Sequence, residues 1–399
     1  MDRPTYNSVH WVLVAMPDVD PWNEDEVGRI QERMNRFGIE PLDDIEGILP
    51  DHRFVRRDIL FGHRGMRPFL ETLQEGGRTA AITGIMPSGE MHMGHKVVVD
   101  TVKMLQEAGA EVTLVVADVE AYNTREMSME DARDLAVDQY LRNHVALGLD
   151  MDDTDFYFQS EAGNRHHVMS KKFSRYVTQN EFESTYGDAS PAKVTSSFTQ
   201  YADILRPQFD SPCPTTVPVG IDQDPHIRLT REVAHKYPAD FHKPASLYNR
   251  FMRGLTGGKM SSSQPKSYIS LTDSVEEAKQ KIDDAKTGGQ DSLEEHRRKG
   301  GDVSEDMVFE LLAYHLVEDD AELERIRREY ESGEMLSGEL KRLQRAESRS
   351  SSLNTRERGR KRSRWSNRFS RNACSEGPCS LATPCPARNS MLIRRLPFP

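Results

Sequence analysis

The sequence predicts an α/β protein in which a parallel sheet covered by helices is followed by a separate group of helices. Between about residues 76 and 267, short runs of β-branched and small residues alternate with longer segments of helical periodicity, which is the pattern of βαβ units. From Ile269 onward the pattern changes to helices that are rich in charge. A chain of 399 residues is long enough for two or three domains with a sizeable core.

Residues before the α/β unit predict an N-terminal extension. Residues 27–34 have helical periodicity, and an aromatic and basic stretch follows at residues 54–61. The predicted organisation is an extension at 1–75, the α/β unit at 76–267, a helical domain at 268–343 and a basic tail at 344–399.

The α/β unit is expected to begin with a strand over residues 78–85, which ends in a Pro-Ser-Gly turn at 87–89. A helix is predicted over residues 92–105, and the next strand over residues 111–117. A strand, a turn, a helix and a parallel strand form one right-handed βαβ unit, whose ligand site lies at the carboxyl ends of the strands.

The later elements follow the same reasoning. Further helices are predicted over residues 132–148, 274–285, 306–316 and 321–332, and further strands over residues 156–158 and 215–221. After about residue 343 the periodicity stops and arginine and serine dominate, so we expect the tail to be disordered.

The net charge changes sign along the chain, from acidic before residue 341 to basic after it. The net charge is −11, yet residues 341–399 hold 15 Lys and Arg against 3 Asp and Glu, so the rest of the chain is strongly acidic. An acidic surface repels nucleic acids unless salt screens the repulsion, to a Debye length of roughly 3 Å at 1 M. The composition is typical either of ordinary solubility or of a halophilic organism with a high-salt cytoplasm.

Composition also excludes several classes of protein. No apolar run approaches the ~20 residues of a membrane helix, and the first residues lack the blocks of a signal peptide, so a cytoplasmic protein is expected. Three of the four cysteines lie in the tail and Cys213 stands alone in the body, which argues against a disulfide framework. The tail cysteines match no zinc spacing, and no protein-bound metal is expected.

The most informative motif is His92-Met93-Gly94-His95, which follows the predicted strand and its turn. The histidines, three positions apart, lie on one face of the predicted helix, and the glycine allows a base to approach the backbone. Imidazoles placed there can stabilise charge that develops on phosphates without taking a proton. Alone the tetrapeptide is a weak signal, because two histidines at this spacing are usually a surface or metal-like coincidence.

A second phosphate-binding segment is predicted in the Gly-rich loop of residues 257–263. Its lysine can reach the β and γ phosphates while serines and backbone N–H groups position them. Such loops also arise by chance, but the pairing with the upstream motif favours an ATP site. The predicted ATP-binding residues are Pro87, Ser88, Gly89, His92, Gly94, His95, Lys259, Met260, Ser261, Ser262 and Ser263, of which His92, His95 and Lys259 are the expected catalytic groups.

These motifs and several further stretches resemble the tryptophanyl-tRNA synthetases of the archaeal and eukaryotic type, which are class I aminoacyl-tRNA synthetases. The matching stretches are residues 83–96, 221–231, 259–265, 269–273, 288–291, 294–297 and 332–341. The family's lysine loop usually ends in Lys-Ser, and Ser262 stands in place of that lysine, as a small residue does in tryptophan enzymes of this branch.

The resemblance covers about residues 50–342 and implies a Rossmann-type catalytic domain with a C-terminal α-helical anticodon-binding bundle. It implies tryptophan activation with ATP, transfer to tRNA(Trp), and a homodimer that binds neither membrane nor DNA. Mg²⁺ is expected to arrive with ATP, held mainly through the phosphates rather than by a protein cage.

The resemblance also implies an amino-acid site. Glu120, just after the second strand, matches the glutamate that binds the α-ammonium group, and Gln223 resembles the glutamine that helps to hold the amino acid. Where the eukaryotic enzymes hold the indole with a tyrosine and a glutamine, this chain has Ile82 and Val115, neither of which accepts a hydrogen bond.

We therefore expect Asp203 to accept the indole N–H, with Gln200 on the same helix as a further substrate-binding residue. The segment 198–205 resembles the helix that supplies the indole-binding aspartate in bacterial tryptophan enzymes. An aspartate would also accept from a tyrosine hydroxyl, so a tyrosine-activating enzyme is the alternative. The segments 221–225 and 332–340 favour tryptophan.

A regulatory RNA-binding relative without charging activity is a second alternative. The presence of both histidines of the upstream motif together with Lys259 argues against it.

The tail departs from the family, whose members continue with helices that complete the bundle. The abrupt change of charge and cysteine usage favours a frameshifted reading, which an intact helical frame in another register of the nucleotide sequence would support. An arginine-rich tail that binds RNA by counterion release is the alternative. If the last helices are missing, adenylate formation should survive while tRNA aminoacylation weakens.

Overall fold

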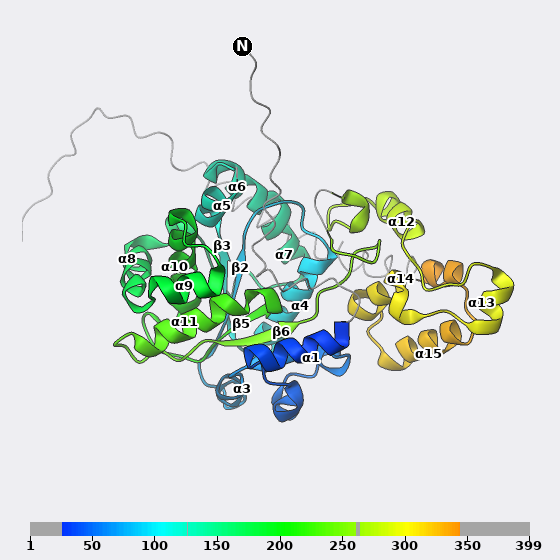
Figure 1. Ribbon diagram of the computed structural model, residues 1–399, viewed down its shortest axis with the longest axis horizontal. Helices are drawn as coiled ribbons and strands as arrows, with labels where there is room; N and C mark the ends of the chain where they lie inside the picture. Colours follow the sequence, from blue (N-terminus) through cyan, green and yellow to red (C-terminus); the bar gives the residue numbers. More distant parts are fainter. Residues whose placement is uncertain (1–25, 126, 261–263, 344–399) are drawn as a thin grey trace, which may run out of the picture.

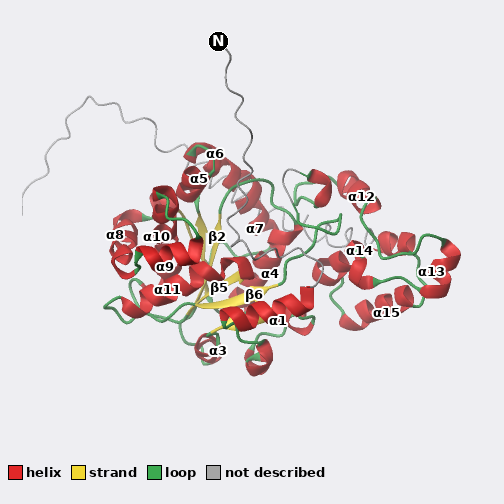
Figure 2. Ribbon diagram, viewed as in Figure 1, coloured by secondary structure: helices red, strands yellow, loops and turns green. Residues whose placement is uncertain are grey.

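A six-stranded sheet forms the centre of the computed structural model, which describes residues 26–125, 127–260 and 264–343 (Figure 2). The strands are β1 (Leu60–Arg64), β2 (Ala80–Ile85), β3 (Glu111–Val116), β4 (Thr154–Phe158), β5 (Thr215–Gly220) and β6 (Ala245–Asn249). Their order is β1-β6-β5-β2-β3-β4. Strands β2 to β6 pair in parallel, and β1 adds to the edge of β6 in the antiparallel sense.

Fifteen α-helices lie in the described part of the chain. They are α1 (Glu26–Phe37), α2 (Arg53–Arg56), α3 (Arg67–Gln74), α4 (Met93–Glu107), α5 (Asp118–Thr124), α6 (Met129–Leu135), α7 (Arg142–Leu147), α8 (Gly163–Phe173), α9 (Gln179–Tyr186), α10 (Pro191–Leu205), α11 (Asp224–Lys236), α12 (Val275–Asp283), α13 (Leu293–Lys299), α14 (Met307–Leu311) and α15 (Asp320–Glu331). A π-helical turn, Ala136–Leu141, joins α6 to α7, and another, Leu312–Leu316, continues α14.

Helices cover both faces of the sheet because successive side chains of a strand point to opposite sides. In β2, Ala81 packs in the cluster that contains Val97 of α4. Its neighbour Ile82 packs instead with Ile204 of α10 and Ile227 of α11. The sheet is therefore buried on both faces, as expected of parallel strands.

Helices α12 to α15 gather at one end of the molecule, and α8 to α11 at the other (Figure 1). The first group does not have a core of its own. Val308 and Leu312 belong to one continuous cluster of buried side chains with Phe54, Leu105 and Met260. The helical group is thus packed directly against the α/β unit.

The structure confirms the predicted α/β class and most predicted elements. The strands predicted over 78–85, 111–117, 156–158 and 215–221 are β2, β3, β4 and β5, and the helices predicted over 132–148, 274–285, 306–316 and 321–332 are found as α6 with α7, α12, α14 with its π turn, and α15. The helical segment near residues 27–34 is α1.

Two features differ from the prediction. Strand β1 lies within residues 1–75, so the central sheet extends into the segment predicted as an appended extension. The helix predicted from His92 begins one residue later, because His92 is extended (φ −125°, ψ 176°) and caps α4 instead of joining it. No helix in the described parts of the chain is both long and apolar enough to cross a membrane.

Candidate active site

The carboxyl ends of five parallel strands bring the predicted site residues to one edge of the sheet. The turn at 87–89 follows β2, Glu120 follows β3, Gln159 follows β4, Asp222 follows β5, and the loop with Lys259 follows β6. Ligands of open α/β sheets bind in the crevice at this edge. Of the predicted site residues, those of the turn at 87–89, Glu120 and Lys259 thus lie at this edge, whereas Gln200 and Asp203 are on α10.

The two histidines of the upstream motif form a reciprocal cap on α4. Nδ1 of His92 accepts the Gly94 N–H at 3.2 Å, and Nδ1 of His95 accepts the His92 N–H at 3.1 Å. A ring nitrogen that accepts has no proton, so each neutral ring has its proton on Nε2. Both rings, whose centroids lie 3.9 Å apart, thus keep one N–H group available for a ligand.

The histidines are neutral donors near pH 7 in the free protein. Burial, with a smaller effect of His95, lowers the pKa of His92 to about 3. Burial, with a smaller effect of His144, lowers the pKa of His95 to about 4. The fixed positive charge of the predicted ATP site must then come from Lys259.

The lysine loop lies directly against this motif. Met260 is buried, and a Cβ atom added to Gly94 would lie 3.2 Å from its sulfur. The same Cβ atom would lie 3.1 Å from the His92 ring, so a larger residue at Gly94 would require small shifts of both segments. Lys259 itself is exposed. Burial raises the pKa of Asp222, while the hydrogen bond from Gln223 and the charge of Lys259 oppose this increase. Residues Ser261, Ser262 and Ser263 lie outside the described residues.

A residue that the sequence did not single out lies beside the predicted turn at residues 87–89. Burial raises the pKa of Tyr140, in the π-helical turn after α6, and the nearby polar groups of Ser88 and Gly89 oppose this increase. Pro87 is buried beside them.

Asp203 is almost fully buried, with 2% of its surface exposed, and lies at the centre of a polar network. Its carboxylate accepts hydrogen bonds from the Tyr157 hydroxyl at 2.8 Å, His166 Nε2 at 2.7 Å and Gln159 Nε2 at 2.6 Å. A buried carboxylate needs such partners to offset its loss of hydration.

Gln159 links this carboxylate to the second acidic residue of the site. Its Oε1 accepts the backbone N–H of Glu120 at 3.2 Å, while its Nε2 donates to Asp203. Burial raises the pKa of Glu120 to about 7, the charge of Asp203 adds to the increase, and Arg125 opposes it. Glu120 of α5 and Asp203 of α10 are therefore two interacting carboxyl groups that favour a bound cation.

Two further predicted residues lie on neighbouring elements. Gln200 is on α10, one turn before Asp203, so the two share a helix face. The Gln223 side chain donates to Asp222 at 2.7 Å, next to the lysine loop. Ile82 and Val115 are buried, and neither side chain has a polar atom that could bind the indole N–H.

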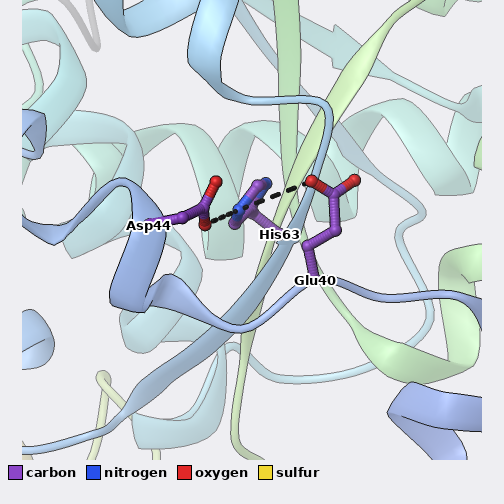
Figure 3. A group of neighbouring side chains, drawn as sticks. All are labelled: Glu40, Asp44 and His63. Atoms are coloured by element: carbon purple, nitrogen blue, oxygen red, sulfur yellow. Dashed lines mark hydrogen bonds and ion pairs between the residues drawn. The ribbon is translucent and has the colours of Figure 1, made fainter.

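A possible metal-binding group lies elsewhere. Among the described residues, Glu40, Asp44 and His63 meet at the β1 edge of the sheet (Figure 3). Nε2 of His63 lies 2.9 Å from Asp44 Oδ1, and its Nδ1 accepts the Met66 N–H at 3.4 Å. The neutral ring then has its proton on Nε2 and donates it to Asp44, so this geometry favours a hydrogen bond over a metal ligand.

A parallel sheet with a histidine motif after its first parallel strand and a lysine loop after its last one defines a class I aminoacyl-tRNA synthetase. Comparison with known families agrees, because the family model described as tRNA synthetases class I (W and Y) matches residues 74–351. The chain belongs to this family.

Three individual relatives are similar to this chain over most of its length. The chain is 44% identical to the tryptophan–tRNA ligase of Methanopyrus kandleri, over 82% of this chain and 89% of the relative. It is 41% identical to the tryptophan–tRNA ligase of Methanocaldococcus jannaschii, over 83% and 92%. The crystal structure of tryptophanyl-tRNA synthetase from Aeropyrum pernix K1 superposes with a TM-score of 0.82 at 39% identity, over 88% of this chain and 98% of that one.

Proposed function

We propose that this chain activates L-tryptophan with ATP, forming tryptophanyl-adenylate and pyrophosphate, and then transfers the tryptophan to tRNA(Trp). The observations that support this most strongly are the close approach of the His92 motif to the Lys259 loop and the pairing, through Gln159, of half-buried Glu120 with buried Asp203. Relatives with more than 40% identity over most of the chain are tryptophan–tRNA ligases.

In the first step a carboxylate oxygen of tryptophan attacks the α-phosphorus of ATP, and the bond to the leaving pyrophosphate breaks. The Nε2–H groups of His92 and His95 donate to phosphate oxygens, where their hydrogen bonds strengthen as negative charge develops. Lys259 supplies positive charge to the β and γ phosphates. Mg²⁺ enters bound to ATP as part of the substrate.

Selection of the amino acid falls to the other half of the site. Glu120 binds the α-ammonium group, and Gln200 and Gln223 contribute hydrogen bonds to the amino acid. Asp203 Oδ1 already accepts two hydrogen bonds, whereas Oδ2 accepts that of Gln159, so we place the indole N–H on Oδ2. A buried acceptor of this kind rejects analogues that cannot donate, because it would remain unpaired.

The helical group α12 to α15 is proposed to contact the anticodon part of the tRNA, and the protein to act as a cytoplasmic homodimer. The acidic composition supports a high-salt cytoplasm, where screening permits a polyanion to bind.

Aminoacylation of a tRNA(Trp) transcript at molar salt tests the proposal. Charging with tryptophan and not with tyrosine is expected, and Asp203→Asn should lower the tryptophan affinity while leaving the KM for ATP unchanged. Charging with tyrosine instead, at a site that retains all the groups named, would contradict it.

A further inference from the structure

The first residue of α4 is held from outside the α/β unit through both of its backbone polar groups. The Met93 N–H donates to the Ile269 carbonyl at 3.2 Å, and the Met93 carbonyl accepts from His315 Nε2 at 3.0 Å. The flanking backbone pairs in the same way, since His92 forms a β-bridge with Ser270 and the Leu271 N–H donates to the Met91 carbonyl at 2.9 Å. The segment between the two catalytic histidines is thus fastened to the C-terminal part of the chain.

His315 is well suited to hold this carbonyl. Its ring is fully buried, and because a carbonyl can only accept, Nε2 has the ring proton. Its other nitrogen lies 3.8 Å from Asp100 Oδ2, which is beyond hydrogen-bond distance. Burial lowers the pKa of His315 to about 4, so the ring is neutral near pH 7 and this tautomer is the one that the structure requires.

A second set of contacts fixes the rotation of the same helix. Asp100, two turns into α4, pairs with Lys96 on its own helix and with Arg53 of α2 at 3.2 Å. Arg53 in turn donates to the Tyr314 carbonyl at 3.1 Å. Neighbouring residues of one π-helical turn, Leu312–Leu316, therefore contact α4 directly at its first turn and through Arg53 at its second.

We infer that His315 is a positioning residue for adenylate formation, which holds the Met93 carbonyl and so fixes where His92 and His95 present their Nε2–H groups to ATP. The inference rests on the proposed function and adds a residue from the helical group to its machinery. It does not involve contact between His315 and ATP. The residue acts through the backbone that carries the cap of α4.

Loss of the His315 contact should affect the part of the site that binds ATP and not the part that binds tryptophan. A shift of about 1 Å in a catalytic group can reduce a rate by about 100-fold, so even a small rotation of the first turn of α4 should be measurable. Glu120 and Asp203 lie on α5 and α10, away from this turn. Loss of the contact should therefore change the kinetics with ATP and leave the tryptophan KM unchanged.

Three variants of the full-length chain separate positioning from folding. His315→Leu removes the donor, and His315→Gln keeps an N–H group near the Nε2 position. Leu312→Ala is the matched control, because Leu312 is fully buried in the same π-helical turn and its truncation loosens packing without removing the donor. Tryptophan-dependent ATP–pyrophosphate exchange and thermal unfolding are measured for each.

We expect His315→Leu to lower kcat/KM for ATP roughly 3- to 10-fold, the range for losing one hydrogen bond, with an unchanged KM for tryptophan. His315→Gln should recover most of this loss, and Leu312→Ala should lower the unfolding temperature without the same kinetic change. Three outcomes would overturn the inference but not the proposed function. They are normal exchange by His315→Leu, a loss of exchange that His315→Gln does not recover, and the same ATP defect in Leu312→Ala. Absence of exchange in the unaltered protein would overturn the proposed function and the inference with it.

Discussion

The raised pKa of Glu120 predicts that tryptophan binding weakens as the solution becomes acidic. Burial and the charge of Asp203 raise this pKa to about 7, and a bound ammonium group favours the ionised carboxylate. Affinity should therefore be near its maximum from about pH 8 upward and decline as the pH falls through 7. About nine-tenths of the carboxyl groups are ionised one pH unit above the pKa and about one-tenth one unit below it, so the Kd should rise about 10-fold between these two conditions.

Equilibrium titration of the protein with tryptophan, without ATP and at constant salt, measures this dependence. The pKa values of His92, His95, His144 and His226 lie near 3 or 4, so these rings stay neutral throughout the window. Glu120→Gln should bind weakly at every pH and show no dependence. A Kd that stays constant between about pH 6 and 8 in the unaltered protein, or an equal slope in Glu120→Gln, would refute the reasoning.

Three further predictions concern the α4 cap, the lysine loop and the helical group. His95→Asn keeps an acceptor for the His92 N–H but loses Nε2–H, so ATP–pyrophosphate exchange should fall about 100- to 1000-fold with little change in unfolding temperature. His95→Ala loses the acceptor as well, so it should also lose about 1 kcal/mol of stability. Exchange kinetics and unfolding curves of the two variants check both. Lys259→Ala should lower exchange at least about 10-fold without changing stability, because the side chain is exposed, and Lys259→Arg should recover part of it. Gly300→Ala should lower the free energy of unfolding by about 3 kcal/mol or more, because the φ of Gly300 is +76° and a Cβ atom would lie 1.7 Å from the Glu331 carbonyl oxygen. Gly338→Ala is the control, because a Cβ atom there would have nothing within 4 Å, and it should not be destabilised. Urea titration measures both.

Most of the sheet could be predicted because strands buried on both faces leave continuous apolar runs in the sequence. Strand β6 was not predicted, since its five residues, Ala245–Asn249, are short and follow an irregular loop. Strand β1 was assigned to an extension because an antiparallel edge pairing with a strand nearly 200 residues away leaves no local signal. Local patterns predict elements, while pairing between distant segments is decided by packing.

The contacts within the predicted ATP site left a clearer signal in the sequence than those around Asp203, for a similar reason. The His92 motif is a contiguous segment whose spacing reflects its own cap, and the structure brings it against Met260 as expected of paired motifs. The partners of Asp203 lie about 40 residues from it on other elements, so neither Tyr157 nor Gln159 stands out in the sequence. His315 is 222 residues from the carbonyl that it holds, and no sequence pattern connects them.

Amino-acid-dependent ATP–pyrophosphate exchange at molar salt is the most direct test of the central claim. The protein is compared with tryptophan and tyrosine as substrates, and Lys259→Ala is the control. Exchange with tryptophan alone, abolished or strongly reduced in the control, is the predicted result. A folded protein that catalyses exchange with neither amino acid, or only with tyrosine, would contradict the account.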